Sequence, residues 1–369
     1  MEDMVTSAAS GVGFWAGKRV FLTGHTGFKG GWLALWLAHR GSLVRGFALD
    51  PATTPNLFDV VRLGTQVEDV RGDIRDPNSL DTALCDFAPD LVFHLAAQPL
   101  VKLSYDQPIL TYETNIIGTA RLLDAVRRAP SVRAVVVVTS DKCYENKEWA
   151  WGYRESDPLG GYDPYSSSKA CAEIVSAAFR QSYFPVDKLA EHKVAVATAR
   201  AGNVIGGGDW SIDRLIPDLV RGFLNGQPVP IRRPNSIRPW QHVLEPLSGY
   251  LMLAEKLLTG DPKYATAYNF GPSYDDARPV HWIADHMTKN WGGGSGWFSD
   301  EGSGVHEAGY LKLDASRAHN DLLWTPVLHL GESLDWLIRW YKAHAEGQDM
   351  QAFTLQQIKD YEALSALTP

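Results

Sequence analysis

Short β-branched segments alternate with longer helical patterns from Lys18 to about Arg200, and this alternation constrains the fold more than any other feature. Strands separated by helices pair in parallel, because a right-handed crossover returns the chain to the same end of the sheet. We therefore predict an α/β fold: a Rossmann-type doubly wound parallel sheet with helices on both faces. The expected strands are 18–24, 43–49, 67–74, 90–97 and 134–140, and the expected helices are 30–41, 76–87, 111–129 and 164–179.

The regular rhythm ends near Arg200, where glycines 206–208 and several prolines follow. We expect a short N-terminal extension (1–16) and a dinucleotide-binding domain (17–200) that includes the helix at 164–179. Residues 201–369 should form mainly a smaller mixed α/β substrate lobe, with some segments returning to the main domain.

Composition narrows the class of partner. The chain has 369 residues with ordinary hydrophobic content, and its net charge of −8 argues against nucleic acid or an anionic membrane as a partner. Three cysteines without metal-ligand spacing, and 11 histidines without zinc spacing, indicate a reducing cytoplasm and no metal. We also expect no membrane span and no signal peptide.

The segment TGHTGFKG follows the first expected strand and places Gly24, Gly27 and Gly30 three residues apart. Glycines there let the backbone approach a pyrophosphate at a helix N-terminus. Asp50 follows Gly30 by 20 residues, where a carboxylate binds ribose hydroxyls and repels a 2′-phosphate, so NAD is expected rather than NADP. The alternative for Asp50 is a turn-forming role before Pro51.

Tyr165 and Lys169 are four residues apart in a helical pattern, so they should lie on one face, one turn apart. A neighbouring ammonium favours a phenolate and should lower the pKa of Tyr165, which would then serve as a general base. By themselves the two residues fit an ordinary exposed helix face better than a catalytic pair.

The glycine turn, FHLAAQ (93–98), TNIIGT (114–119), TSDK (139–142) and YSSSK (165–169) occur in this order. Together they resemble the extended short-chain dehydrogenase/reductase family, over roughly residues 19–342. RAGNVIGGGDW, RPWQHV and YNFGP are similar to the nucleotide-sugar branch of that family.

The resemblance implies roles for particular residues. It implies contacts with NAD from the glycine turn, the ends of three strands and two helices, catalysis by five residues, and sugar-nucleotide contacts by another five. The implied cofactor residues are Gly24, His25, Thr26, Gly27, Phe28, Gly30, Asp50, Asp73, Ile74, Leu95, Ala96, Ala97, Thr114, Tyr165 and Lys169; the catalytic residues are Ser140, Asp141, Lys142, Tyr165 and Lys169; the substrate residues are Gln98, Asn203, Arg214, Arg238 and Asn269. Asn203 and Asn269 fit turn-stabilising roles as well.

The resemblance implies 4,6-dehydration of a nucleotide sugar, with CDP-glucose as substrate and recycled NAD. Related dTDP-sugar dehydratases carry Asp-Glu where this chain has Asp141-Lys142. Elimination needs a base at C5 and an acid at C6, and we assign Lys142 and Asp141 to these roles, although the reverse stays open. Adjacent strand residues point to opposite faces, so the two groups should avoid an ion pair only if the chain curls there.

Three alternatives remain: another nucleotide-sugar 4,6-dehydratase, a 4-epimerase, and a non-catalytic NAD-binding scaffold. An epimerase shares the Tyr–Lys pair but needs no acid and base at C5 and C6. We expect a homodimer by resemblance. Trp149, Trp151 and Tyr153 should serve packing or a lid rather than catalysis.

Overall fold

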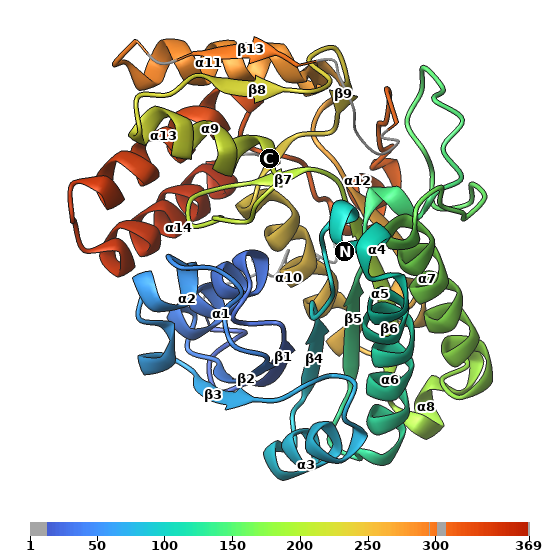
Figure 1. Ribbon diagram of the computed structural model, residues 1–369. Coiled ribbons are helices and arrows are strands. Elements are labelled where there is room, and N and C mark those ends of the chain that lie inside the picture. Colours follow the sequence, from blue (N-terminus) through green and yellow to red (C-terminus); the bar gives the residue numbers. More distant parts are fainter. Residues whose placement is uncertain (1–12, 295, 301–307, 368–369) are drawn as a thin grey trace, which may run out of the picture.

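A seven-stranded parallel sheet forms the centre of the computed structural model, which describes residues 13–294, 296–300 and 308–367 (Figure 1). Most of the expected N-terminal extension therefore lies outside the described residues. In spatial order the strands are β11 (Ala267–Phe270), β6 (Ala195–Ala201), β5 (Ala134–Val138), β4 (Leu91–His94), β1 (Arg19–Thr23), β2 (Leu43–Ala48) and β3 (Glu68–Arg71). The predicted fold class is confirmed.

The sheet separates two hydrophobic layers, because alternate residues of each strand point to opposite faces. In β5, Val136 and Val138 join one buried cluster, whereas Val135 and Val137 join the other. A strand buried on both faces has no polar side, which explains its run of valines.

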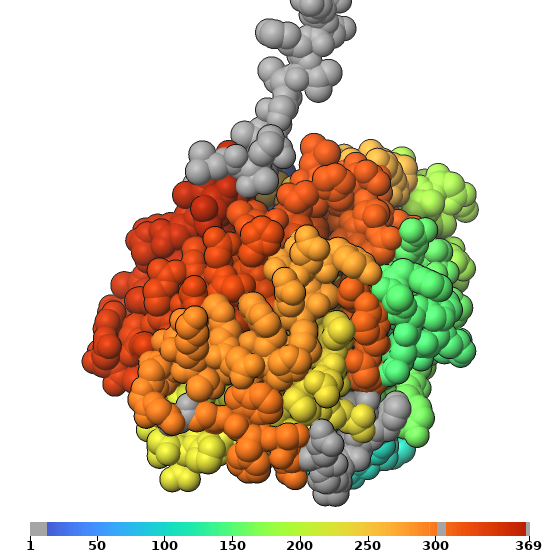
Figure 2. Space-filling model, turned by 90° about the horizontal axis from the view of Figure 1, so that it is seen from above, coloured from blue at the N-terminus to red at the C-terminus, as the bar shows by residue number. Residues whose placement is uncertain are grey.

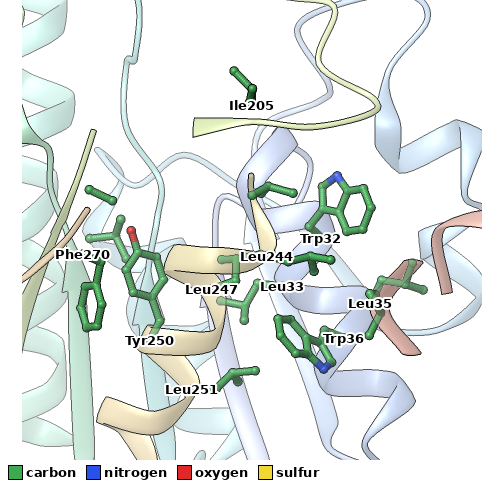
Figure 3. Close-up of a cluster of buried hydrophobic side chains, with 14 of the residues drawn as sticks. Trp32, Leu33, Leu35, Trp36, Ile205, Leu244, Leu247, Tyr250, Leu251 and Phe270 are labelled. Carbon is green, nitrogen blue, oxygen red and sulfur yellow. The ribbon is translucent and has the colours of Figure 1, made fainter. Parts of the chain in front are cut away.

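The larger layer contains α1 (Phe28–His39) and α10 (Leu244–Leu258). Figure 3 shows Trp32 and Trp36 of α1 beside leucines of α10, and Tyr250 of α10 beside Phe270 of β11. The opposite layer holds α3 (Pro77–Phe87), α6 (Gly118–Arg128) and α7 (Pro164–Ser182). Residues that start and end helices lie at the helix boundaries: Asp76 caps α3, and Gly41, with a φ of 84°, follows α1.

The helix expected at 111–129 is interrupted. The chain forms α5 (Pro108–Tyr112), a π-helical turn (Glu113–Ile117) and then α6. Within that turn the buried Asn115 amide donates to the Gln98 carbonyl and to Ser168 Oγ, and accepts from the Gln98 N–H. The bulge therefore aims one polar side chain at α7 and at the segment after β4, a tertiary arrangement that periodicity does not reveal.

The second half of the chain builds a smaller lobe around the sheet's carboxyl edge, and one of its strands, β11, joins the main sheet beside β6. In Figure 2, segments of this half, in yellow to red, form most of the visible face. The remaining strands of this half are β7 (Val204–Ile205), β8 (Val229–Ile231), β9 (Ile237–Arg238), β10 (Gln241–His242), β12 (Arg278–Pro279) and β13 (Trp297–Ser299), and its other helices are α9 (Leu215–Leu224), α11 (Val280–Trp291), α12 (Ser316–Leu322), α13 (Leu330–Ala345) and α14 (Met350–Leu367). Short helices α2 (Leu57–Val60), α4 (Val101–Asp106) and α8 (Leu189–His192) lie in the first half. The domain division at residue 200 stays a prediction.

A buried ion pair connects α7 to the two strands beneath it. The Glu173 carboxylate, 2% exposed, accepts from Arg200 Nη2 at 2.8 Å and Thr198 Oγ1 at 2.7 Å, both on β6, and from Thr139 Oγ1 after β5. Burial opposes ionisation of Glu173, but Arg200 and these hydrogen bonds outweigh it and lower the pKa of Glu173. The contact fixes α7 against the ends of β5 and β6.

We expect Glu173→Leu to lower the free energy of unfolding by about 3–5 kcal/mol, because it leaves Arg200 buried without a counter-charge. The double variant Glu173→Leu/Arg200→Met removes both charges and should recover most of that loss. Urea denaturation of both variants measures the difference. Equal destabilisation of the two would show that the ion pair itself does not hold α7 in place.

Candidate active site

A cavity of about 1020 Å³ opens at the carboxyl ends of β1, β4 and β5, beneath the lobe. In a doubly wound sheet this edge is where ligands bind, since helices and loops diverge at the point where strand order reverses. Here the order reverses between β1 and β4, so segments far apart in the sequence meet.

The glycine turn between β1 and α1 forms one wall of the cavity, and its glycines are required by close contacts. A Cβ on Gly24 would lie 2.8 Å from the Ala96 nitrogen, and one on Gly30 would lie 2.1 Å from the Gly24 carbonyl oxygen. Gly24 also has a φ of 82°. The turn therefore brings bare backbone and the α1 N-terminus to the cavity, which suits a pyrophosphate.

Nearly all of the expected cofactor residues line this cavity. Asp50, its side chain 90% exposed, lies at the rim with Arg71 Nη1 3.5 Å away. The Asp73 carboxylate is paired with Arg75, whose hydrogen bond lowers the pKa of Asp73. The lining residues among those expected to hold the cofactor are Gly24, Thr26, Gly27, Phe28, Gly30, Asp50, Asp73, Ile74, Leu95, Ala96, Ala97, Thr114, Tyr165 and Lys169.

His25 departs from the expectation. Its ring is fully buried, and Nε2 is hydrogen-bonded to Asp69 Oδ1 at 2.8 Å. The ring also packs on β2, where a Cβ on Gly46 would lie 2.2 Å from it. The side chain therefore points into the sheet, away from the cavity. Within the glycine turn, His25 joins β1 to β2 and β3 instead of contacting a cofactor through its ring.

Tyr165 and Lys169 lie one turn apart on α7 and both line the cavity. Lys169 Nζ donates to the Val138 carbonyl at the end of β5, at 3.4 Å, and burial lowers the pKa of Lys169 to about 8. The expected lowering of the Tyr165 pKa is not observed: burial raises the pKa of Tyr165 to about 12, despite a hydrogen bond with Ser140. Desolvation of a phenolate, reinforced by the charges of Asp141 and Asp163, outweighs the Ser140 hydrogen bond and the Arg214 charge.

The chain curls at the end of β5. Ser140 caps the single turn Asp141–Cys143, and its hydroxyl donates to Asp141 Oδ1 at 2.9 Å. Asp141 is 2% exposed, and Oδ2 has no hydrogen-bond partner among the described residues. Lys142 Nζ instead lies over the Tyr165 ring, 6.0 Å from its centroid.

The side chains of Asp141 and Lys142 are thus held apart. Within the described ranges no ion pair joins Asp141 to Lys142. Burial raises the pKa of Asp141, although the Lys142 charge, the Ser140 hydrogen bond and Arg238 oppose the shift. Burial therefore favours the protonated form of Asp141, the form that can act as an acid.

The expected substrate residues fall into two groups. Gln98, Asn203, Arg214 and Arg238 line the cavity, and Arg214 Nη1 donates to Asp209 at 3.0 Å. Asn269 does not line it.

Asn269 is fully buried, with Oδ1 accepting from the Tyr144 hydroxyl and Nδ2 donating to the Tyr153 and Asp314 carbonyls. Its amide is saturated by protein groups, so we assign it to the scaffold. Tyr153 stacks on Tyr144 and Trp149, which places these aromatic residues in packing.

Sequence reasoning missed many polar residues of the cavity wall, among them Lys29, Arg232, Arg233 and Trp240. Trp240 is 7% exposed, and its Nε1 has no partner in the described part of the chain. Lys29 is the one charged residue within the otherwise apolar start of α1, a signal that the sequence offered. The described residues contain no group of three or more side chains suited to a metal. No described helix has the length and apolar character that crossing a membrane requires.

A parallel sheet with a glycine turn at its reversal point, and a Tyr–Lys helix over the same cavity, defines a dinucleotide-binding protein of the short-chain dehydrogenase/reductase class. Residues 20–271 match the family model described as NAD dependent epimerase/dehydratase. The chain belongs to this family, and the expected use of NAD agrees with it.

Individual relatives extend the comparison. The chain is 54% identical over 355 residues to a CDP-glucose 4,6-dehydratase of Salmonella typhimurium, covering 96% of this chain and 98% of that protein. It is 27% identical over 300 residues to a dTDP-glucose 4,6-dehydratase of Streptomyces griseus, covering 80% and 84%. A solved structure of MoeE5 in complex with UDP-glucose and NAD superposes with a TM-score of 0.73 at 26% identity, covering 89% of this chain and 99% of that one.

We expect Gly30→Ala to lower the free energy of unfolding by about 1–3 kcal/mol, because the added methyl group overlaps the Gly24 backbone. Gly27→Ala is the matched control, since its Cβ would meet only the Gly24 carbonyl oxygen at 3.4 Å. Thermal unfolding measures both. Comparable stability of the two variants would contradict the close packing of α1 on the turn.

Proposed function

We propose that this protein is an NAD-dependent lyase that converts CDP-glucose to CDP-4-keto-6-deoxyglucose and water. The observation that carries the proposal is the arrangement at the end of β5: a buried acid, Asp141, and an amine, Lys142, held apart beside Tyr165. Oxidation alone needs one base, whereas elimination of water needs a base and an acid at neighbouring carbons.

The residues of the cavity fit each step. A nicotinamide held in this cavity would supply the redox chemistry, which is hydride transfer from C4 of the sugar and hydride return to C6. Burial alone keeps Tyr165 protonated, but the positive nicotinamide ring of a bound NAD⁺ would favour the phenolate and oppose that shift. As a phenolate, Tyr165 accepts the C4 hydroxyl proton, and the resulting ketone acidifies C5. Lys142 removes the C5 proton and later returns a proton there, while Asp141 protonates the hydroxyl that leaves C6 as water. The individual assignments to Lys142 and Asp141 are part of the proposal.

The proton balance of this cycle indicates a role for Ser140 between Tyr165 and Asp141. Tyr165 gains one proton, which the ketone product does not take back, and Asp141 loses one. The Ser140 hydroxyl is hydrogen-bonded to Tyr165 and donates to Asp141 Oδ1 at 2.9 Å. It therefore lies between the group that must lose a proton and the group that must regain one.

Other residues of the same cavity suit the phosphate and ribose groups of the cofactor and the substrate. The backbone of the glycine turn suits the NAD pyrophosphate, and Asp50 suits an unphosphorylated ribose. Arg214 and Arg238 suit the substrate diphosphate, because a guanidinium binds phosphate oxygens through two donors. Preference for cytosine is supported by the 54% identity to the Salmonella typhimurium dehydratase.

We also infer that the protein works as a cytoplasmic homodimer in deoxysugar synthesis, including that of lipopolysaccharide O-antigen. Three exposed isoleucines on neighbouring helical segments support the dimer: Ile109 on α5, Ile117 in the π-helical turn and Ile174 on α7, which are 68%, 45% and 54% exposed. Exposed apolar surface of this kind suits a second copy of the chain.

We expect CDP-glucose carrying deuterium at C4 to yield a product with deuterium at C6 of the same molecule. The reason is that the hydride leaves and returns within one bound cofactor, without NADH accumulating in solution. Mass spectrometry of the product from mixed labelled and unlabelled substrate measures the transfer. Deuterium released in free NADH would indicate a plain dehydrogenase, and deuterium retained at C4 an epimerase. Parallel incubations with dTDP-, GDP- and UDP-glucose test the base preference.

We expect Asp141→Asn and Lys142→Met to block the cycle after C4 oxidation, each lowering turnover by roughly 10²–10⁴-fold. Lys142→Met should stop exchange of the C5 proton with deuterated water and accumulate bound NADH. Asp141→Asn should retain that exchange but release water slowly, because an amide is a poor acid.

Tyr165→Phe is the contrasting variant, since it should prevent NADH formation altogether. Absorbance of bound NADH and mass-resolved exchange distinguish the three. If Asp141→Asn abolished exchange while Lys142→Met kept it, the two roles would be reversed.

A further inference from the structure

Lys29 carries an amine on the cavity wall that the glycine turn forms. None of the proposed steps of the reaction uses this amine. It lies between Gly27 and Gly30, at the start of α1, and lines the cavity. Its Nζ donates to the hydroxyl of Tyr250, 3.1 Å away, and Tyr250 is fully buried on α10. In the described part of the chain no carboxylate forms an ion pair with it.

The charged groups around Lys29 come from three other elements. Lys169 on α7 and Arg214 at the start of α9 repel its positive charge, while Asp141 after β5 attracts it. Burial, reinforced by the two cations, lowers the pKa of Lys29 to about 7. Tyr250 is neutral, because burial and the nearby Tyr165 raise its pKa.

The position of Lys29 indicates which part of a dinucleotide it faces. It belongs to the turn that holds the pyrophosphate, so it approaches the cofactor from the α1 side. It also lies within electrostatic reach of Lys169 and Asp141, which mark the reacting end of the cavity. Hydride transfer requires the nicotinamide at that same end.

We propose that Lys29, held by Tyr250, is a positioning residue that discriminates between the two redox states of the bound cofactor. The nicotinamide ring of NAD⁺ carries a positive charge, and that of NADH is neutral. An ammonium beside the ring disfavours NAD⁺ relative to NADH and so favours withdrawal of hydride from the sugar. The pyrophosphate charge is common to both forms and cancels in the ratio of their dissociation constants.

This inference rests on the proposed dinucleotide site, and its test measures binding rather than turnover. The dissociation constants of NAD⁺ and NADH are measured by calorimetry for the full-length protein between pH 6 and pH 9. Lys29 is charged below its pKa and neutral above it. As pH rises through about 7, the NAD⁺/NADH ratio of dissociation constants should therefore fall in the wild type, by roughly tenfold for a shift of one pKa unit.

Lys29→Met should lower this ratio at pH 6 by roughly tenfold and remove its change near pH 7, whereas Lys29→Arg should keep the high ratio through pH 7. Any change that Lys169 causes near its own pKa of about 8 should persist in both variants. Tyr250→Phe should retain the ratio change but move its midpoint, because the hydrogen-bond partner of Lys29 is lost. Lys256→Met, on α10 but outside the cavity lining, controls for net charge and should leave the ratio unchanged.

Two results would overturn the inference. Equal weakening of NAD⁺ and NADH in Lys29→Met would show that Lys29 binds the pyrophosphate. An unchanged ratio with unchanged affinities would show that Lys29 does not face the cofactor. Failure of the wild type to bind either form would instead remove the proposed dinucleotide site.

Discussion

The Glu173 carboxylate holds together the two parts of the proposed catalytic site. It lies on α7, one turn after Lys169, and binds Thr139 at the end of β5 and Arg200 on β6. Tyr165 and Lys169 come from α7, whereas Ser140 and Asp141 follow β5 directly. A buried carboxylate tolerates few positions without losing hydrogen bonds, so this contact sets the register between helix and strand. The polar network lies beneath the site and leaves the cavity wall free for ligands.

Next to this contact, the curl at the end of β5 places the neighbouring residues Asp141 and Lys142 in different environments. An acid and an amine in direct contact would exchange a proton and leave an ion pair, useless for elimination. The turn Asp141–Cys143 buries the carboxyl against Ser140 and directs Lys142 to the Tyr165 ring. Burial then favours a neutral Asp141, and Ser140 connects it to the tyrosine. The geometry of one short turn thus separates two environments within two residues.

Local signals predicted much of this molecule. The strand boundaries of β1, β2 and β5, the Asp76 cap and the glycine stop of α1 all follow from residue chemistry that acts over a few positions. The π-helical turn at Glu113–Ile117 was missed, because Asn115 is held by Gln98 and Ser168 from distant segments. The side-chain contacts of His25 and Asn269 could not be foreseen for the same reason: their partners lie on β3 and in the lobe.

The sequence by itself determined the parallel α/β class, the glycine turn, the spacing of Tyr165 and Lys169, and the family, since each depends on periodicity or on residues close in the chain. Only the tertiary structure decided the electrostatics. The pKa of Tyr165 is raised rather than lowered, that of Asp141 is raised, and Lys29 emerges as an amine with a pKa of about 7. These shifts depend on desolvation and on charges that different elements bring within a few ångströms, and the linear sequence carries neither distance nor burial.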